Sequence, residues 1–276
     1  MIEDISGCID YDETGTGPTV VLVPGSCSTG AAWRPVMAQW DSDFRCVTTS
    51  LLGYGGTQER RSVADTGMAH EAEALETVIR RAGCAVHLVG HSFGGLTALA
   101  VAMRGRVPLL SLTIAEAPAP EILRHMSEQR HYQAFRTMSE AYSSAYQAGD
   151  SDAIEQMIDF YGGKGTFAGW PQRVRDHASQ TTPANLLDWT TAYGFELTPE
   201  LLAAVRIPAL VLWGEASHPA AIRANQLLGQ YIPNAATAAI AGAAHFMIAT
   251  HAGEVAGRIA QHVARTEDRA LAAESI

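Results

Sequence analysis

The segment that most constrains the fold of this chain is AVHLVGHSFGG, residues 85–95. Residues 85–89 are apolar and predict a buried strand, and residues 96–104 have the spacing of a helix. A Gly-x-Ser-x-Gly motif between a strand and a helix is typical of a nucleophile elbow, a strained turn that needs glycines where side chains would clash. The motif therefore predicts that Ser92 projects from a sharp turn at the edge of a sheet.

Short apolar runs alternate with stretches of helical spacing along most of the chain. Strands are predicted at residues 20–23, 46–52, 85–89, 110–114, 209–213 and 236–241. Helices are predicted at residues 31–40, 62–82, 96–104 and 253–265. Apolar strands separated by helices are typical of a parallel sheet covered on both faces. The predicted fold class is α/β, with a doubly wound, mostly parallel sheet.

Residues 121–205 break this alternation, because they predict several helices without a strand. We expect residues 1–120 and 206–276 to form the core, and residues 121–205 to form an inserted helical cap. The insertion holds 11 of the 20 aromatic residues: Tyr132, Phe135, Tyr142, Tyr146, Phe160, Tyr161, Phe167, Trp170, Trp189, Tyr193 and Phe195. Two interpretations stay open, namely that these rings line an apolar substrate pocket or that they form the core of the insertion itself.

Charge and cysteine content exclude several classes of function. The chain has 19 Lys and Arg against 29 Asp and Glu, a net charge of −10, whereas nucleic-acid binding favours the opposite sign. No apolar run has the length of a membrane span, and the N-terminus starts with acidic residues, so we expect a cytoplasmic protein that binds no membrane. The four cysteines lack metal-ligand spacing, and Cys27 is interpreted as a small apolar filler.

The strand, the GHSFGG motif at 90–95 and the following helix resemble the α/β-hydrolase family, and the resemblance extends from Val20 to about Val263. It implies a serine hydrolase with Ser92 as nucleophile. A serine hydroxyl needs a base, which in this family follows the last strand. Among the 10 histidines, the resemblance assigns that role to His245, in GAAHF before the final helix.

The third member of the implied triad is harder to place. The family usually has an aspartate after the strand at 209–213, but Ser217 occupies that position, and a serine carries no charge to balance an imidazolium. Some lactone hydrolases and haloalkane dehalogenases of the family carry the acid at the end of the preceding strand, where this chain has Glu116. We expect Glu116 to be the acid; Glu215, a third site or the absence of an acid stay open as alternatives.

The resemblance also implies an oxyanion hole made of two backbone N–H groups. One belongs to Phe93, after the nucleophile. The other lies in the loop PGSCSTG at 24–30, where Pro24 replaces the usual histidine. Ser26 is the expected donor, and Cys27 stays an alternative.

These observations predict hydrolysis of a carboxylic ester or lactone of a small, apolar substrate through an acyl-enzyme. No metal or organic cofactor is implied, and a homodimer is compatible with the sequence. One alternative is cleavage of a carbon–carbon bond next to a ketone, and another is a non-catalytic small-molecule receptor on the same fold. Dehalogenation is disfavoured, because it needs an aspartate at the position of Ser92.

Overall fold

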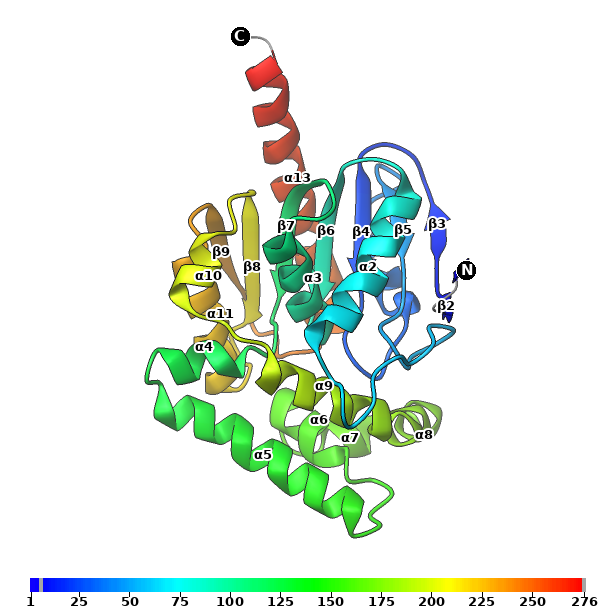
Figure 1. Cartoon of the computed structure of the whole chain (residues 1–276), viewed down its shortest axis with the longest axis vertical. Coiled ribbons are helices and arrows are strands. Elements are labelled where there is room, and N and C mark those ends of the chain that lie inside the picture. The colour runs from blue at the N-terminus through cyan, green and yellow to red at the C-terminus, as the bar shows by residue number, and fades with distance from the viewer. Residues whose placement is uncertain (5–6, 275–276) are drawn as a thin grey trace.

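The computed structural model describes residues 1–4 and 7–274 (Figure 1). Residues 5, 6, 275 and 276, which the predicted core includes, lie outside this description. Among the described residues, seven strands form one sheet in the order β3-β5-β4-β6-β7-β8-β9. All neighbouring pairs are parallel except β3 with β5, which confirms the predicted α/β fold with a mostly parallel sheet.

The strands of this sheet are β3 (Asp12–Thr14), β4 (Thr19–Val23), β5 (Arg45–Thr48), β6 (Val86–His91), β7 (Leu109–Ala115), β8 (Ala209–Gly214) and β9 (Ala235–Ile240). A separate antiparallel pair is formed by β1 (Ile2–Asp4) and β2 (Gly7–Ile9). The helices of the core are η1 (Gly30–Trp33), α1 (Arg34–Met37), α2 (Met68–Ala82), α3 (Phe93–Arg104), α11 (Pro219–Tyr231), α12 (Met247–Thr250) and α13 (Ala252–Glu274). None of these or the other described helices is long and apolar enough to cross a bilayer.

The sheet is buried on both faces, which explains the continuous apolar strands. In β4, Val21 and Val23 pack into a core shared with α2, α3 and α11. The alternate residues Val20 and Leu22 pack into a second core with α1, α12 and α13 on the other face. Successive side chains of a strand point to opposite faces, so a strand covered on both sides is apolar throughout.

Helices fill the connection between β7 and β8. They are α4 (Pro120–His125), α5 (Gln129–Gln147), α6 (Glu155–Gly162), α7 (Thr166–Gly169), α8 (Gln172–Gln180), α9 (Thr182–Gly194) and α10 (Pro199–Ala203). Figure 1 shows α5 to α9 gathered at the end of the sheet opposite to the projecting end of α13. The predicted division into domains at residues 121 and 205 stays a prediction.

Several predicted boundaries were wrong. The strand predicted at 46–52 ends at Thr48, and Leu51 and Leu52 continue the apolar run because they are buried in the following loop. The helix predicted at 62–82 begins at Met68, since Ser62 and Asp65 exchange backbone hydrogen bonds of 3.0 Å in a closed turn.

The other predicted helices also changed at their ends. The one predicted at 31–40 is a 3₁₀ turn, η1, followed by the short α1, whose Pro35 lies in the first turn. The helix predicted at 96–104 begins at Phe93, directly after the elbow serine. The last helix continues beyond the predicted end at 265 to Glu274.

Candidate active site

Ser92 lies at the tight turn between β6 and α3, as the motif predicts. Its φ of 53° and ψ of −128° are a strained conformation for a residue with a side chain. The turn is possible because Gly94 passes so close to β4 that an added Cβ would overlap the carbonyl oxygen of Pro24. The Ser92 N–H donates to the carbonyl oxygen of Ala115, 2.9 Å away, which fixes the turn against the end of β7.

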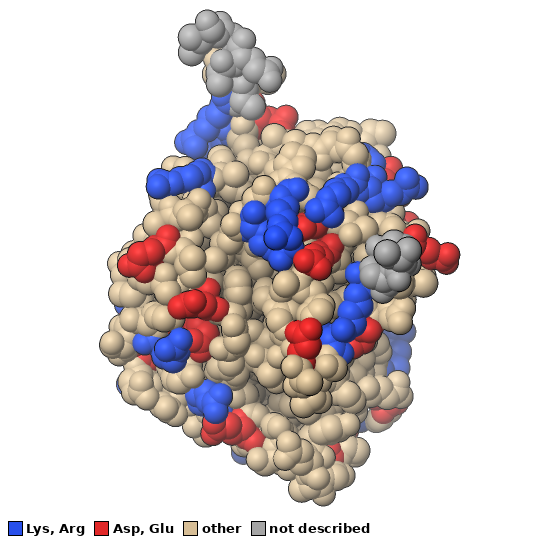
Figure 2. Space-filling model, in the orientation of Figure 1, with Lys and Arg blue, Asp and Glu red and all other residues tan. Residues whose placement is uncertain are grey.

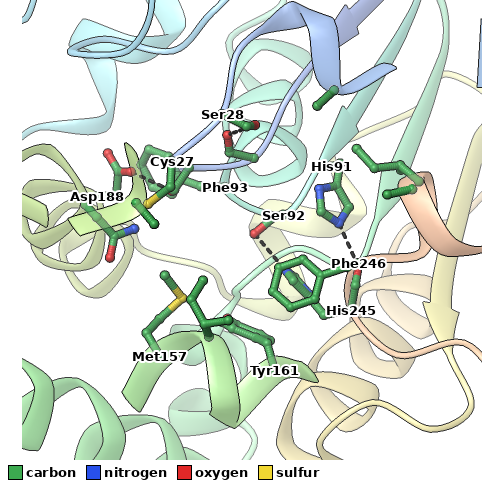
Figure 3. Close-up of a pocket in the computed structure, with 18 of the residues that line it drawn as sticks. Cys27, Ser28, His91, Ser92, Phe93, Met157, Tyr161, Asp188, His245 and Phe246 are labelled. Carbon is green, nitrogen blue, oxygen red and sulfur yellow. Dashed lines mark hydrogen bonds between the residues drawn. The ribbon is translucent and has the colours of Figure 1, made fainter. Parts of the chain in front are cut away.

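The structure brings the predicted Ser92, His245 and Glu116 together. Figure 3 shows the Ser92 hydroxyl directed at the ring of His245. The His245 Nε2 lies 2.9 Å from Ser92 Oγ, and its Nδ1 lies 2.8 Å from Glu116 Oε1. The carboxylate accepts from Nδ1–H, which leaves Nε2 as the acceptor for the Ser92 hydroxyl. The three side chains are buried and come from the ends of β6 and β7 and from the loop after β9.

Glu116 and not Glu215 contacts the histidine. Besides His245, Glu116 accepts hydrogen bonds at Oε2 from the Gly214 N–H at 2.8 Å and from the Ser217 hydroxyl at 2.7 Å. Ser217, which occupies the position where an aspartate is expected, thus donates a hydrogen bond to Glu116. Glu215 is exposed. A fully buried carboxylate needs such partners, and these contacts satisfy both of its oxygens.

His91, next to the nucleophile, also contacts the histidine segment. Its Nε2 donates to the carbonyl oxygen of His245 at 2.8 Å, which requires a proton on Nε2. Burial, together with the nearby His245, lowers the pKa of His91 to about 3. His91 therefore remains neutral in the folded protein and anchors the loop that carries His245.

This lowered pKa predicts a pH dependence of stability. The unfolded chain binds a proton at His91 below about pH 6.5 and the folded chain does not, so the free energy of unfolding falls as pH drops from 6.5 toward 3. His91→Gln keeps an N–H donor without titrating. In urea unfolding at stepwise lower pH, the free energy of unfolding of this variant should fall less steeply than that of the wild type. The two slopes should differ by at most about 1.4 kcal/mol per pH unit. His177→Gln, at an exposed histidine, is the matched control; equal slopes for His91→Gln and wild type would contradict the assignment.

The two predicted oxyanion residues lie at the same cavity as Ser92. Ser26 follows β4 and Phe93 begins α3, and both line this cavity. Cys27, the alternative to Ser26, has a positive φ of 60° and also lines it. Burial raises the pKa of the Cys27 thiol to about 12, so it stays a neutral thiol at neutral pH.

The cavity has a volume of about 320 Å³ and is mostly apolar. Of the 11 rings noted in the insertion, Tyr161, Trp170 and Trp189 line it. Phe135 and Tyr142 are instead fully buried within the core, so part of the aromatic cluster lines the cavity and part of it is packed in the core. That the cavity binds a substrate stays a prediction. Figure 3 shows Met157 and Tyr161 projecting from α6 toward the space in front of Ser92 and His245. The ring of Tyr161 stacks on that of His245 with centroids 3.9 Å apart.

Sequence reasoning missed a buried ionic cluster beside the cavity, centred on Arg61 and Asp188. The guanidinium of Arg61 lies 2.8 Å from Asp188, 3.2 Å from Glu71 and 2.8 Å from Glu59. Burial raises the pKa of Glu71 above its usual range, and the nearby Arg61 opposes that rise. The one available signal was Asp188 itself, a single acid between Leu186, Leu187 and Trp189 in the sequence.

The fold and the hydrogen-bonded Ser–His–carboxylate arrangement define the chain as an α/β hydrolase, and comparison with known proteins agrees. Residues 18–252 match the family described as alpha/beta hydrolase fold. A 2-hydroxy-6-oxo-2,4-heptadienoate hydrolase of Pseudomonas putida is 35% identical over 99 residues, which are 33% of this chain and 34% of that protein. The matches to the first curated relatives span only about a third of their length.

Solved structures are similar over nearly the whole chain. An esterase from Thermogutta terrifontis has a TM-score of 0.75 at 22% identity, covering 94% of this chain and 93% of that one. The enol-lactonase from Burkholderia xenovorans has a TM-score of 0.70 at 16% identity, covering 93% and 96%. The chain belongs to the α/β-hydrolase family of enzymes, which confirms the predicted family and class of enzyme.

Proposed function

We propose that this protein hydrolyses a carboxylic ester or lactone of a small, largely apolar substrate through an acyl-enzyme on Ser92. The observation that carries the proposal is the continuous hydrogen-bonded line from Ser92 Oγ through His245 to Glu116, with distances of 2.9 and 2.8 Å. A nucleophile, a base and an orienting carboxylate in this order are the parts that acyl transfer requires. Ser92 and His245 line an apolar cavity, and Glu116 is buried behind His245.

In the first half of the reaction, His245 Nε2 takes the hydroxyl proton while Ser92 Oγ attacks the carbonyl carbon. The negative charge on the former carbonyl oxygen is held by the backbone N–H groups of Phe93 and Ser26. The protonated His245, stabilised by Glu116, then gives its proton to the alkoxide, which leaves. In the second half, His245 takes a proton from water, the hydroxide attacks the acyl carbon, and the proton returns to Ser92 as the acid is released.

The cavity and the surface charge favour a neutral substrate. Met157, Ile158, Trp170 and Phe246 give the cavity apolar walls. The net charge of −10 disfavours anionic substrates. On the face drawn in Figure 2, Lys and Arg are interspersed with Asp and Glu, which supports the proposal that no nucleic acid binds there. We further propose that residues 121–205 act as a cap over Ser92.

A homologous series of p-nitrophenyl esters, from acetate to decanoate, tests this assignment. Each further buried CH₂ should raise kcat/KM about fourfold, equivalent to about 0.8 kcal/mol, until the cavity is full. Trp170→Ala enlarges the cavity and should move the optimum to longer acyl chains. Tyr146→Ala removes a ring of the insertion from a position outside the cavity, so it should lower Tm and leave the chain-length profile unchanged.

Two further assays separate the alternatives. Labelling of Ser92 by a fluorophosphonate is expected, and its failure would favour a non-catalytic receptor. Faster cleavage of a diketone than of an aryl ester would favour carbon–carbon bond hydrolysis. A homodimer stays a prediction, which light scattering of the purified protein tests.

A further inference from the structure

The cluster around Asp188 has no part in the reaction steps above, although Asp188 lines the same cavity as Ser92 and His245. Asp188 belongs to α9 in the helical insertion, and Arg61 belongs to the segment between β5 and α2. The Arg61 side chain is fully buried, and its Nη1 lies 2.8 Å from Asp188 Oδ1. This ion pair therefore joins the insertion to the core at the border of the substrate cavity.

The second oxygen of Asp188 holds the loop after β4. Asp188 Oδ2 accepts from the Ser26 hydroxyl at 2.6 Å and from the Tyr54 hydroxyl at 2.6 Å. Hydrogen bonds to an ionised carboxylate are roughly twice as strong as neutral ones. Both oxygens of the carboxylate are therefore bound by the protein, Oδ1 by Arg61 and Oδ2 by two hydroxyls. We infer that Asp188 holds Ser26 and does not bind a substrate.

Arg61 reaches the other side of the same site. Its guanidinium carbon lies 5.9 Å from the centroid of the Phe93 ring, within the range of a cation–π contact. The pair Arg61–Asp188 thus contacts the side chains of the two residues whose backbone N–H groups are proposed to bind the oxyanion. Figure 3 shows Asp188, Cys27 and Phe93 on one side of the cavity, next to Ser92.

We propose that Asp188 and Arg61 are positioning residues of the oxyanion hole, and that the helical insertion holds the Ser26 loop in its catalytic position through Asp188. This inference rests on the proposed function. A buried ion pair is a weak source of net stability, because desolvation offsets its attraction. The ion pair instead fixes the position of the oxyanion donors, and this matters because a displacement of about 1 Å in a catalytic group lowers the rate by up to about 10²-fold.

Ser26→Ala is the most direct test, because it keeps the backbone N–H and the Arg61–Asp188 pair and removes only the hydroxyl that ties the loop to Asp188. We expect kcat for a p-nitrophenyl ester to fall about 10- to 100-fold with little change in KM. Ser26→Thr, which keeps a hydroxyl, should restore most of the loss. Ser111→Ala is the matched control: it removes another buried serine hydroxyl, which bonds His87 at 2.8 Å in the core away from the cavity, and should keep kcat near the wild-type value.

Asp188→Asn should lower kcat to a similar extent, and Ser26→Ala/Asp188→Asn should be no slower than the slower single variant. Circular dichroism identifies variants that unfold. If Asp188→Asn is unfolded, Ser26→Ala alone tests the inference. Wild-type kcat in folded Ser26→Ala, or an equal loss in Ser111→Ala, overturns the inference. The proposed function still stands in that case if a fluorophosphonate labels Ser92. Absence of labelling in the wild type, with full turnover in Ser92→Ala, overturns both.

Discussion

Ser92→Ala should lower kcat for an ester substrate by about 10³-fold or more while leaving the fold intact. The nucleophile is lost, and only the oxyanion donors and substrate binding remain to accelerate direct attack by water. Alanine occupies the same strained backbone with a smaller side chain, so the melting temperature should stay close to that of the wild type. Steady-state kinetics together with a thermal melt measure both quantities.

His245→Ala should lose activity to a similar extent, and the double variant should be little worse than either single one, because the two residues act as a unit. Retention of wild-type turnover in folded Ser92→Ala would refute the acyl-enzyme mechanism. Additive losses in the double variant would show that His245 acts on the substrate independently of Ser92.

Glu116→Gln should lower kcat by about 10² to 10⁴. Glutamine has nearly the same shape but lacks the negative charge that stabilises the imidazolium of His245, and its amide can turn the histidine to the wrong tautomer. KM should change far less than kcat, since the side chain is buried behind His245 and does not line the cavity. The measurement is kcat and KM for one ester, from initial rates at concentrations below and above KM.

Two variants serve as controls for this prediction. Glu215→Gln changes an exposed carboxylate in the neighbouring loop and should have little effect. Ser217→Ala removes one of the donors to Glu116 Oε2 and leaves the Gly214 N–H, so a loss of about tenfold or less is expected. A larger loss in Glu215→Gln than in Glu116→Gln would reverse the assignment of the acid.

The nucleophile turn could be predicted from sequence because its determinants are local. An apolar strand, two glycines and a helix within a few residues allow only one kind of turn around Ser92. His245 and Glu116 could be proposed because the resemblance to the family places the base after the last strand and, in some members, the acid after an earlier strand; the carboxyl ends of parallel strands lie at one edge of the sheet. The choice of Glu116 over Glu215 also depended on Ser217, which cannot supply the charge.

The Arg61–Asp188 pair, helix α11 and the first three strands could not be predicted from sequence, because they depend on distant contacts or have weak local patterns. Arg61 and Asp188 are 127 residues apart, and nothing near either one in the sequence indicates the other. Helix α11 was missed because its buried face is largely alanine, including Ala220, Ala221 and Ala224, which gives a weak apolar pattern. The strands β1 to β3 are three residues each, too short for an alternating pattern to appear.

Glu116 directly follows β7 and precedes the helical insertion, which matters if the insertion is exchanged between related proteins. Glu116 donates its N–H to the carbonyl oxygen of Leu212 at 2.8 Å, and the side chain of Asn225 bonds both the N–H and the carbonyl oxygen of Ala117 at 3.0 Å. The carboxylate is thus anchored by β8 and α11 of the core and not by the helices that follow it. If a different helical insertion were grafted from Pro120 onward, we therefore expect Glu116 and His245 to keep their contact. The new insertion would need to supply only residues that line the cavity and a carboxylate equivalent to Asp188.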